Sequence, residues 1–449
     1  MADRRNRAVV VGAGPAGFYT AEQLLAAGFE VDVLDALPTP FGLVRSGVAP
    51  DHPNIKAVTR VYEKTAAREH FRFFGGVTLG DHVSRADLLE RYHAVVYAVG
   101  TPDDNRLGIS GEDLRGSHPA TRFVAWYNGH PDAADEDFDL SAERAVVIGN
   151  GNVAIDVARM LVLHPDELIQ TDAADHAIEA LGRSQVREVV LLGRRGPAQA
   201  AFTNPELREL GDLQRADVIV DCAELESVQA PEDATKRRNV DTLRDYAARG
   251  ADGRSHRVVL RFMFSPVEIV GDERGRVRGL RVVRNRLDHD GRPVPTDDEE
   301  LIECGLVFRS IGYRGRPLDG IPFDDHRGVI RSQGGRVCDE RGRVCLGEYA
   351  VGWIKRGPSG VIGTNKKDAA DTVAKLLADA QAGALNAPVV DDAGWIDERL
   401  PDLVTWDGWE AIDQYERSTG EPFGRPRVKL VRTEALLAAS RAPTLATPA

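Results

Sequence analysis

The chain opens with two short apolar runs on either side of a segment with helical periodicity. Residues 8–11 are uninterruptedly apolar, which is typical of a buried parallel strand. Apolar side chains then recur at helical spacing between residues 18 and 25, and Gly28 ends this segment. A second, mostly apolar run begins at Val31 and ends at Asp35. The pattern predicts a strand, a helix and a second strand.

A glycine-rich turn joins the first strand to the helix, and it reads Gly12-Ala13-Gly14-Pro15-Ala16-Gly17. In a Rossmann-like unit, the first glycine permits the tight turn, the second lets the backbone approach a pyrophosphate, and the third lets the helix pack on the strand. The helix N-terminus offers N–H groups to the phosphates, and a carboxylate at the end of the second strand accepts hydrogen bonds from a ribose. The residues expected to contact a dinucleotide are Gly12, Gly14, Pro15, Ala16, Gly17 and Asp35. An ordinary glycine turn of an α/β protein is the alternative.

A second unit of the same kind begins near residue 145. The apolar run 145–148 precedes a turn that reads Gly149-Asn150-Gly151-Asn152-Val153-Ala154. The next strand, at residues 186–192, is followed by Gly193-Arg194-Arg195 rather than by an acid. Two guanidiniums at this position can bind a 2′-phosphate that a carboxylate would repel, so this unit favours NADP over NAD. An arginine pair on a solvated face is the alternative. The predicted NADP contacts here are Gly149, Asn150, Gly151, Asn152, Val153, Arg194 and Arg195.

Composition and charge narrow the class of protein. The net charge of −13 disfavours a nucleic-acid binder, and no apolar run reaches the length of a membrane span. The four cysteines include no CxxC pair, which argues against a dithiol redox centre, a structural zinc site or an iron–sulfur cluster, so no metal is expected. A cytoplasmic, reduced protein is the simplest interpretation. The short N-terminus leaves no room for a targeting peptide, although one could have been removed.

The irregular segment after Asp35 carries a more specific pattern. It reads Pro40-Phe41-Gly42-Leu43-Val44-Arg45-Ser46-Gly47-Val48-Ala49-Pro50-Asp51-His52-Pro53. This segment resembles the flavin-side loop of adrenodoxin reductase and the bacterial ferredoxin–NADP⁺ reductases similar to it. The resemblance places Leu43 in contact with FAD and His52, a candidate catalytic residue, close to the redox centre. Capping of the next helix is the alternative for His52. That helix is expected at residues 54–70, with Asn54 as its N-cap.

Two further segments resemble the same reductases. The first runs from Trp353 to residue 363 and precedes a helix expected at about residues 365–377, whose N-terminus would face the flavin. The resemblance implies flavin contacts at Trp353, Gly360, Val361 and Ile362, with further contacts at Val83, Gly100 and Arg106. The second segment spans residues 197–209, where the resemblance makes Glu206 an NADP contact and Glu209 a catalytic carboxylate near the nicotinamide and His52. The resemblance also implies that Gly360, in the first segment, contacts NADP. Trp353 could instead be a core residue, and the two glutamates could simply begin a capped helix.

These motifs predict an α/β protein with two Rossmann-like, three-layer dinucleotide-binding domains. The FAD-binding domain is expected to be discontinuous, with residues 1–103 as its first part and residues 325–449 as its second part, which ends in a C-terminal wrap. The NADP-binding domain is expected at residues 104–324, inserted between them. We favour a monomer.

The resemblance implies hydride transfer from NADPH to FAD, followed by release of single electrons to a ferredoxin of the 2Fe-2S or a similar type, which could feed a cytochrome P450. On a helical segment, the basic cluster Lys236, Arg237, Arg238 and Arg244 is the candidate docking surface for ferredoxin, and a solvated helix face is its alternative. A flavin-dependent NADPH monooxygenase, a diaphorase with another acceptor and a non-catalytic redox sensor remain alternatives. A thioredoxin-reductase-like enzyme would need the missing CxxC.

Overall fold

The computed structural model describes residues 5–226, 228, 231–392 and 394–442. The chain divides into two compact units, one formed by Met1–Asp103 with Tyr313–Ala449 and the other by Asp104–Gly312. The predicted second boundary, after residue 324, is therefore corrected to Gly312. The reason is that Ile321, which the prediction placed in the inserted domain, packs in the hydrophobic core of the first unit together with Val9.

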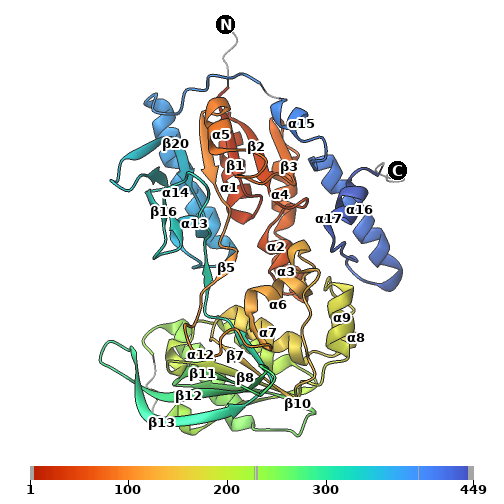
Figure 1. The fold of residues 1–449 in the computed structure, drawn as a ribbon, viewed down its shortest axis with the longest axis vertical. Coiled ribbons are helices and arrows are strands. Elements are labelled where there is room, and N and C mark those ends of the chain that lie inside the picture. The colour runs from red at the N-terminus through yellow and green to blue at the C-terminus, as the bar shows by residue number, and fades with distance from the viewer. Residues whose placement is uncertain (1–4, 227, 229–230, 393, 443–449) are drawn as a thin grey trace. The chain divides into compact units, whose positions relative to one another are not determined.

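A seven-stranded sheet forms the centre of the first unit, in the order β18-β19-β20-β4-β1-β2-β3 (Figure 1). The strands from β20 to β3 are parallel, and β18 and β19 extend the sheet with antiparallel pairing. The apolar runs of the sequence become strands because both faces of this sheet are covered. The strands of the unit, with the short pair β16 and β17, are β1 (Arg7–Val11), β2 (Glu30–Asp35), β3 (Phe71–Gly75), β4 (Ala94–Tyr97), β15 (Tyr313–Arg314), β16 (Phe323–Asp324), β17 (Val329–Ile330), β18 (Ser332–Gln333), β19 (Arg336–Cys338) and β20 (Val344–Ala350).

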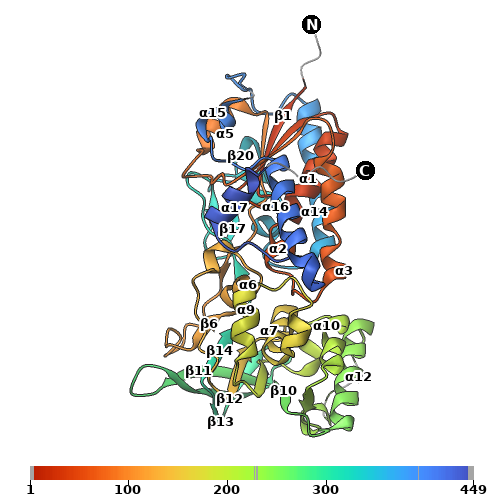
Figure 2. The same cartoon turned by 90° about the vertical axis from the view of Figure 1, so that its right-hand side faces the viewer.

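Helices from both ends of the sequence cover this sheet. α1 (Pro15–Ala26) and α14 (Ile362–Gln381) lie side by side, as Figure 2 shows in red and light blue. Leu24 of α1 and Val373 of α14 share one buried cluster with Val10 of β1. The other helices of the unit are α2 (Leu43–Ser46), α3 (Pro53–Lys56), α4 (Thr59–Ala66), α5 (Arg85–Arg91), α13 (Trp353–Arg356), α15 (Trp395–Arg399), α16 (Trp406–Gly420), η4 (Glu421–Phe423) and α17 (Thr433–Ser440).

The helix expected at residues 54–70 is in fact two shorter helices, α3 and α4. His52, not Asn54, is the N-cap of α3, and Pro53 takes the first helical position. Proline favours that position because its fixed φ suits a helix start and its missing N–H would be unpaired there anyway. The prediction of a single helix capped by Asn54 was therefore wrong.

The second unit has a six-stranded sheet in the order β6-β14-β7-β8-β10-β9, in which all neighbours are parallel. A three-stranded antiparallel sheet, β11-β12-β13, packs on one face of it. Ile148 of the parallel sheet and Leu280 of the antiparallel sheet belong to the same buried cluster. The strands are β6 (Ser117–Pro119), β7 (Arg144–Ile148), β8 (Glu188–Gly193), β9 (Ala216–Val220), β10 (His256–Phe262), β11 (Phe264–Gly271), β12 (Val277–Leu287), β13 (Pro293–Glu303) and β14 (Leu306–Arg309), with β5 (Asp103–Asp104) at the junction.

Helices pack along the parallel sheet of this unit and complete its layers. α7 contacts β7, β8 and β10, while α12 contacts β9. The helices of the unit are α6 (Ala120–Tyr127), η1 (Pro131–Ala133), α7 (Asn152–Val162), α8 (Pro165–Leu168), α9 (Asp175–Gly182), η2 (Pro197–Gln199), α10 (Asn204–Glu209), η3 (Leu210–Asp212), α11 (Ala223–Glu226) and α12 (Ala234–Arg249). Within the described part of the chain, we find no helix with the length and apolar character needed to cross a bilayer.

Candidate dinucleotide-binding sites

The glycine turn of the first unit has little room except where a ligand would lie. Gly12 has a φ of +113°, and a Cβ on it would stand 2.5 Å from the carbonyl oxygen of Ala98. A Cβ on Gly17 would stand 1.9 Å from the Gly12 oxygen. A Cβ on Gly14, in contrast, would meet nothing within 4 Å. Gly14 therefore borders open space at the N-terminus of α1, as the close approach of a pyrophosphate requires.

Asp35, at the end of β2, holds this turn in place. Its Oδ2 accepts a hydrogen bond from the Ala13 amide at 2.7 Å, and its Oδ1 accepts one from the Leu37 amide at 2.9 Å. Burial raises the pKa of the carboxyl group to about 6, although the two amides oppose this shift. A ribose hydroxyl that donates to this carboxylate would favour its charged form, so the residue fits the role predicted for it.

The loop at residues 40–53 runs over the glycine turn. The Phe41 amide donates to the Ala13 oxygen at 2.8 Å, and a Cβ on Gly42 would stand 3.0 Å from the Gly14 Cα. Leu43, the predicted flavin contact, begins α2 and is 39% exposed. His52 is buried, with Nε2 4.0 Å from the Asp51 carboxylate. The structure thus brings the loop to the turn by backbone contact.

A buried ion pair, which the sequence did not reveal, ties this loop to the C-terminal segment. Arg45 of α2 donates to both carboxylate oxygens of Glu416 in α16, at 2.8 and 2.6 Å. Glu416 is fully buried, and it also pairs with Arg427 at 3.0 Å. The two guanidiniums lower the pKa of Glu416 against the opposing effect of burial. No local pattern could have predicted this contact, because 371 residues separate the two partners.

Trp353 and the N-terminus of α14 follow β20 in the first unit. A Cβ on Gly352 would stand 2.7 Å from the Ala16 Cβ, so this turn lies against the start of α1. Trp353 packs against Tyr313 with ring centroids 5.4 Å apart, and its buried indole nitrogen has no hydrogen-bond partner among the described residues. Gly360 has a φ of +81°, Val361 is the N-cap of α14 and Ile362 is its first residue.

Three other predicted flavin contacts are more scattered. Val83 is buried in the core of the first unit, and Gly100 follows β4 with a φ of +69°. Arg106 belongs to the second unit, where it pairs with Asp113 at 2.6 Å and is mostly exposed. Its contact with the flavin stays a prediction.

The glycine turn of the second unit has the same arrangement as that of the first: one glycine is tightly packed and another borders open space. Gly149 has a φ of +139°, and a Cβ on it would stand 2.0 Å from the Ser310 oxygen. Gly151, the N-cap of α7, borders open space, because a Cβ there would meet nothing within 4 Å. Asn152 accepts a hydrogen bond from the Thr203 amide at 2.8 Å, and Asn150 packs against Gly193. Val153 follows Asn152 in α7.

Arg194 and Arg195 follow β8, where the first unit has Asp35. Both side chains are exposed, and neither has a carboxylate partner among the described residues. Their backbone is fixed, because the Arg195 oxygen accepts from the Met263 amide at 3.2 Å and the Arg194 oxygen from Asn285 at 2.8 Å. Two uncommitted guanidiniums on an ordered backbone suit the recognition of a phosphate.

The two predicted glutamates lie on α10. Glu206 is in its first turn and Glu209 is its last residue. Glu209 pairs with Arg159 of α7 at 3.1 Å, and Arg159 also lies 3.5 Å from Asp156. Arg159 is buried and was not singled out in the sequence, where an arginine within a helix is unremarkable.

The basic cluster Lys236, Arg237, Arg238 and Arg244 lies on α12, and all four side chains are exposed. Arg237 and Arg244 are seven residues apart, which places them on one face of the helix. Arg237 donates to the Pro231 and Glu232 oxygens, and Arg244 lies 3.5 Å from Asp241. The predicted helix is confirmed, and docking stays a prediction.

Taken separately, the two units define a protein with two dinucleotide sites of opposite character. In each unit a glycine turn offers open space at a helix N-terminus, which fits a pyrophosphate. A carboxylate follows in the first unit and two guanidiniums in the second, which fits FAD and NADP respectively. This combination is that of a two-domain, dinucleotide-dependent oxidoreductase.

Known proteins share this organisation over nearly the whole chain. A family model described as an NAD(P)-binding Rossmann-like domain matches residues 10–76. NADPH-ferredoxin reductase FprA of Mycobacterium leprae is 50% identical over 449 residues, covering 95% of this chain and 97% of that protein. The mitochondrial NADPH:adrenodoxin oxidoreductase of Arabidopsis thaliana is 40% identical, covering 96% of this chain and 94% of that protein. The structure of Mycobacterium tuberculosis FprA in complex with NADPH matches with a TM-score of 0.93 at 48% identity, covering 98% of this chain and 100% of that one.

The chain therefore belongs to the family of adrenodoxin reductase-like NADPH–ferredoxin reductases. The family resemblance and the α/β, Rossmann-like fold class predicted from the sequence are confirmed.

Proposed function

We propose that this protein is a ferredoxin–NADP⁺ reductase that carries electrons from NADPH to a ferredoxin through FAD. The observation that carries the proposal is the pair of glycine turns that border open space, one followed by Asp35 and the other by Arg194 and Arg195. The names of its relatives support the same activity. When bound, FAD supplies the chemistry that converts a two-electron hydride donor into a source of single electrons.

In this reaction the residues of the chain bind FAD and NADPH and orient them. Gly14 and the N-terminus of α1 would hold the FAD pyrophosphate, and Asp35 would accept a hydrogen bond from the ribose. Arg194 and Arg195 would select NADPH by pairing with its 2′-phosphate. The roles of His52 and Glu209 at the site of hydride transfer, and the flavin contacts of the remaining predicted residues, are part of the proposal.

The proposed acceptor is an acidic ferredoxin that docks on the basic cluster of α12. The net charge of −13 opposes this association at long range. The screening length at physiological ionic strength is about 8 Å, so a local cluster of exposed cations can outweigh distant acids at contact. Delivery of the electrons to a cytochrome P450, a monomeric state and a cytoplasmic location stay predictions from the sequence.

The docking proposal has a direct test. Reversal of charge in the double variant Arg238→Glu and Arg244→Glu should slow cytochrome c reduction through ferredoxin and leave ferricyanide reduction unchanged, because that small acceptor does not need the cluster. Reversal of Arg183, an exposed arginine of the same unit that pairs with Glu179 in the preceding turn, is the matched control. Equal loss in both assays would place the damage in the fold. No loss in either would place docking elsewhere.

The activity itself is tested by NADPH-driven reduction of cytochrome c, with and without added ferredoxin. We expect ferredoxin to increase the rate strongly, and NADPH oxidation to match the electrons that reach cytochrome c. A rate independent of ferredoxin would favour a diaphorase with another acceptor. An oxygenated product would favour a monooxygenase, and dinucleotide binding without turnover on ferricyanide would favour a redox sensor.

A further inference from the structure

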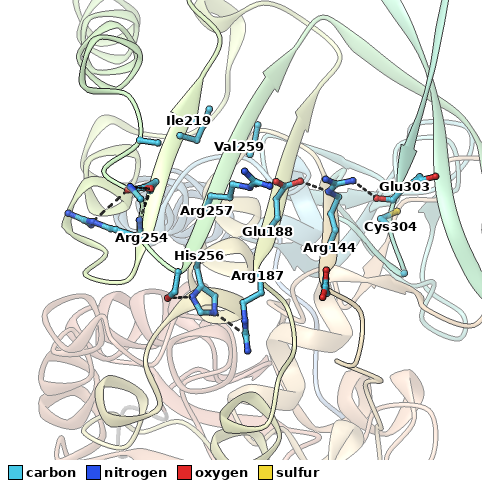
Figure 3. Close-up of a pocket in the computed structure, with 16 residues that line it drawn as sticks. Arg144, Arg187, Glu188, Ile219, Arg254, His256, Arg257, Val259, Glu303 and Cys304 are labelled. Carbon is cyan, nitrogen blue, oxygen red and sulfur yellow. Dashed lines mark hydrogen bonds and ion pairs between the residues drawn. The ribbon is translucent and has the colours of Figure 1, made fainter.

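A polar cavity of about 750 Å³ lies in the second unit, away from its glycine turn. Its lining includes the first residues of three parallel strands, namely Arg144 of β7, Glu188 of β8 and His256 of β10 (Figure 3). The turn at Gly149 follows the last residue of β7. In parallel strands the amino ends share one edge of the sheet and the carboxyl ends share the other, so the cavity is at the edge opposite the coenzyme turn.

Four acids line this cavity; Glu143 and Glu303 are exposed, whereas Glu188 and Asp217 are engaged by cations or amides. Glu188 pairs with both Arg144 and Arg257, as Figure 3 shows. Asp217 accepts hydrogen bonds from the amides of three consecutive residues, at 3.1, 3.0 and 2.9 Å, and pairs with Arg254. These carboxylates therefore have little capacity left to neutralise other cations nearby.

Arg187, Ser255 and His256 also line the cavity, and Arg215 lies beside them on the far side of the His256 ring. The His256 ring is buried, and its Nε2 lies 3.2 Å from Arg187 Nη1 and in contact with the Arg215 guanidinium. Ser255 Oγ lies 2.8 Å from Nδ1 of the same ring. Neither Arg187 nor Arg215 has a carboxylate within ion-pair distance in the part of the chain that the structure describes.

Burial and neighbouring cations both disfavour positive charge in this group. Burial and the two arginines lower the pKa of His256 to about 4, so the ring is neutral at pH 7. Burial and Arg187 also lower the pKa of Arg215, and only the field of Glu167 opposes them. A bound anion between the two guanidiniums would relieve this repulsion.

We propose that Arg187, Arg215, Ser255 and His256 form a binding site for a phosphate-type oxyanion at the edge of the sheet opposite the coenzyme turn. Guanidiniums bind phosphate oxygens with paired, charge-assisted hydrogen bonds, and the hydroxyl of Ser255 supplies a further donor. The shared chemistry admits free inorganic phosphate or the phosphate group of a small phosphomonoester, for which the adjoining cavity has room. The site is independent of the proposed reductase activity.

The test is calorimetric titration of the FAD-loaded protein with inorganic phosphate, with NADP⁺ at saturation so that the coenzyme site is occupied. We expect one phosphate to bind per chain. Arg187→Gln and Arg215→Gln should each weaken binding about ten- to a hundredfold, because each removes a charge-assisted contact. Arg183→Gln, the matched control, should bind phosphate as the parent does, because its side chain is 78% exposed and pairs with Glu179 outside the cavity. Parallel titration with glycerol phosphate distinguishes the two sources: tighter binding than phosphate indicates a phosphomonoester, and weaker binding indicates the free ion.

A second measurement keeps the proposal testable if a variant is unstable. In the parent protein, phosphate should raise the pKa of the His256 ring, because a bound anion favours the imidazolium. Proton NMR measures this pKa. Absence of phosphate binding to the parent protein, a His256 titration that phosphate does not change, or equal binding by all three variants would each overturn the proposal.

Discussion

The two units use the same turn to bind dinucleotides but differ in the residues at the end of the next strand. In the first unit that strand ends in Asp35, whose carboxylate accepts hydrogen bonds from the turn itself. In the second, the strand is followed by two exposed arginines, which contact other described residues through their backbone oxygens only. The first unit also has a loop fixed over its turn by a buried ion pair. This difference suits a cofactor that stays bound in the first unit and a coenzyme that exchanges in the second.

The largest effect is expected from the buried ion pair of the first unit. Glu416→Ala leaves Arg45 and Arg427 without their shared carboxylate in a buried site, which should cost about 3–5 kcal/mol of unfolding free energy. Unfolding in denaturant, monitored by the release of flavin, measures this loss. Glu410→Ala, on the exposed face of the same helix, is the control and should change the unfolding free energy by less than about 0.5 kcal/mol. Equal losses in the two variants would show that the pair does not fix the loop.

The matched pair Gly14→Ala and Gly151→Ala separates the two turns. Each added methyl group enters open space in the protein alone, so both variants should fold, but it occupies the space expected for a pyrophosphate. Gly14→Ala should weaken FAD binding about a hundredfold, and Gly151→Ala should do the same for NADPH while the protein stays yellow. Loss of FAD from the Gly151 variant would contradict the assignment of the two turns.

The charge difference after the strands sets the preference for the coenzyme. Arg194→Ala and Arg195→Ala should each raise the Michaelis constant for NADPH about ten- to a hundredfold, because a contact with phosphate contributes about 1.5–3 kcal/mol. The constant for NADH should stay nearly unchanged, since NADH lacks the 2′-phosphate. A parallel loss with both coenzymes would mean that the arginines support the fold.

Asp35 makes FAD binding depend on pH in a direction that the structure fixes. Its pKa in the protein without FAD is raised to about 6, whereas hydroxyl donors of the ribose would lower it in the complex. FAD affinity should therefore be full above about pH 7 and fall about tenfold between pH 7 and pH 5, with proton release on binding. The sign for folding is opposite: the raised pKa stabilises the FAD-free protein as pH falls from about 6 toward the ordinary range of Asp. Asp35→Asn should bind FAD less tightly and without this pH dependence.

The smallest effects are expected at His52 and Glu209. Hydride carries its own proton, so neither side chain is required for the transfer, and His52→Gln should slow it only a few-fold. Glu209→Ala also removes the partner of Arg159, which retains Asp156 at 3.5 Å. Stopped-flow measurement of flavin reduction by NADPH gives the rates. Parent rates in both variants would remove these residues from the site of hydride transfer.

Local patterns in the sequence predicted the parts of the molecule whose residues lie close together along the chain. The two glycine turns, Asp35 and the arginine pair lie within single strand–helix–strand segments, where spacing and backbone conformation carry the information. The Arg45–Glu416 pair and the cluster around His256 join residues distant along the chain, and no periodicity signals them. The break between α3 and α4 depends on the preference of Pro53 for a helix start. The return of the chain to the first unit at Tyr313 depends on core packing, which the sequence pattern did not reveal.

The central claim is that electrons enter from NADPH and leave singly to ferredoxin by way of FAD. Anaerobic stopped-flow mixing tests it most directly, with NADPH added to the FAD-loaded protein first and oxidised ferredoxin second. We predict that NADPH bleaches the flavin far faster than NADH does, and that two equivalents of ferredoxin then restore its colour. Equal bleaching by both coenzymes, or a reduced flavin that ferredoxin fails to reoxidise, would contradict the account.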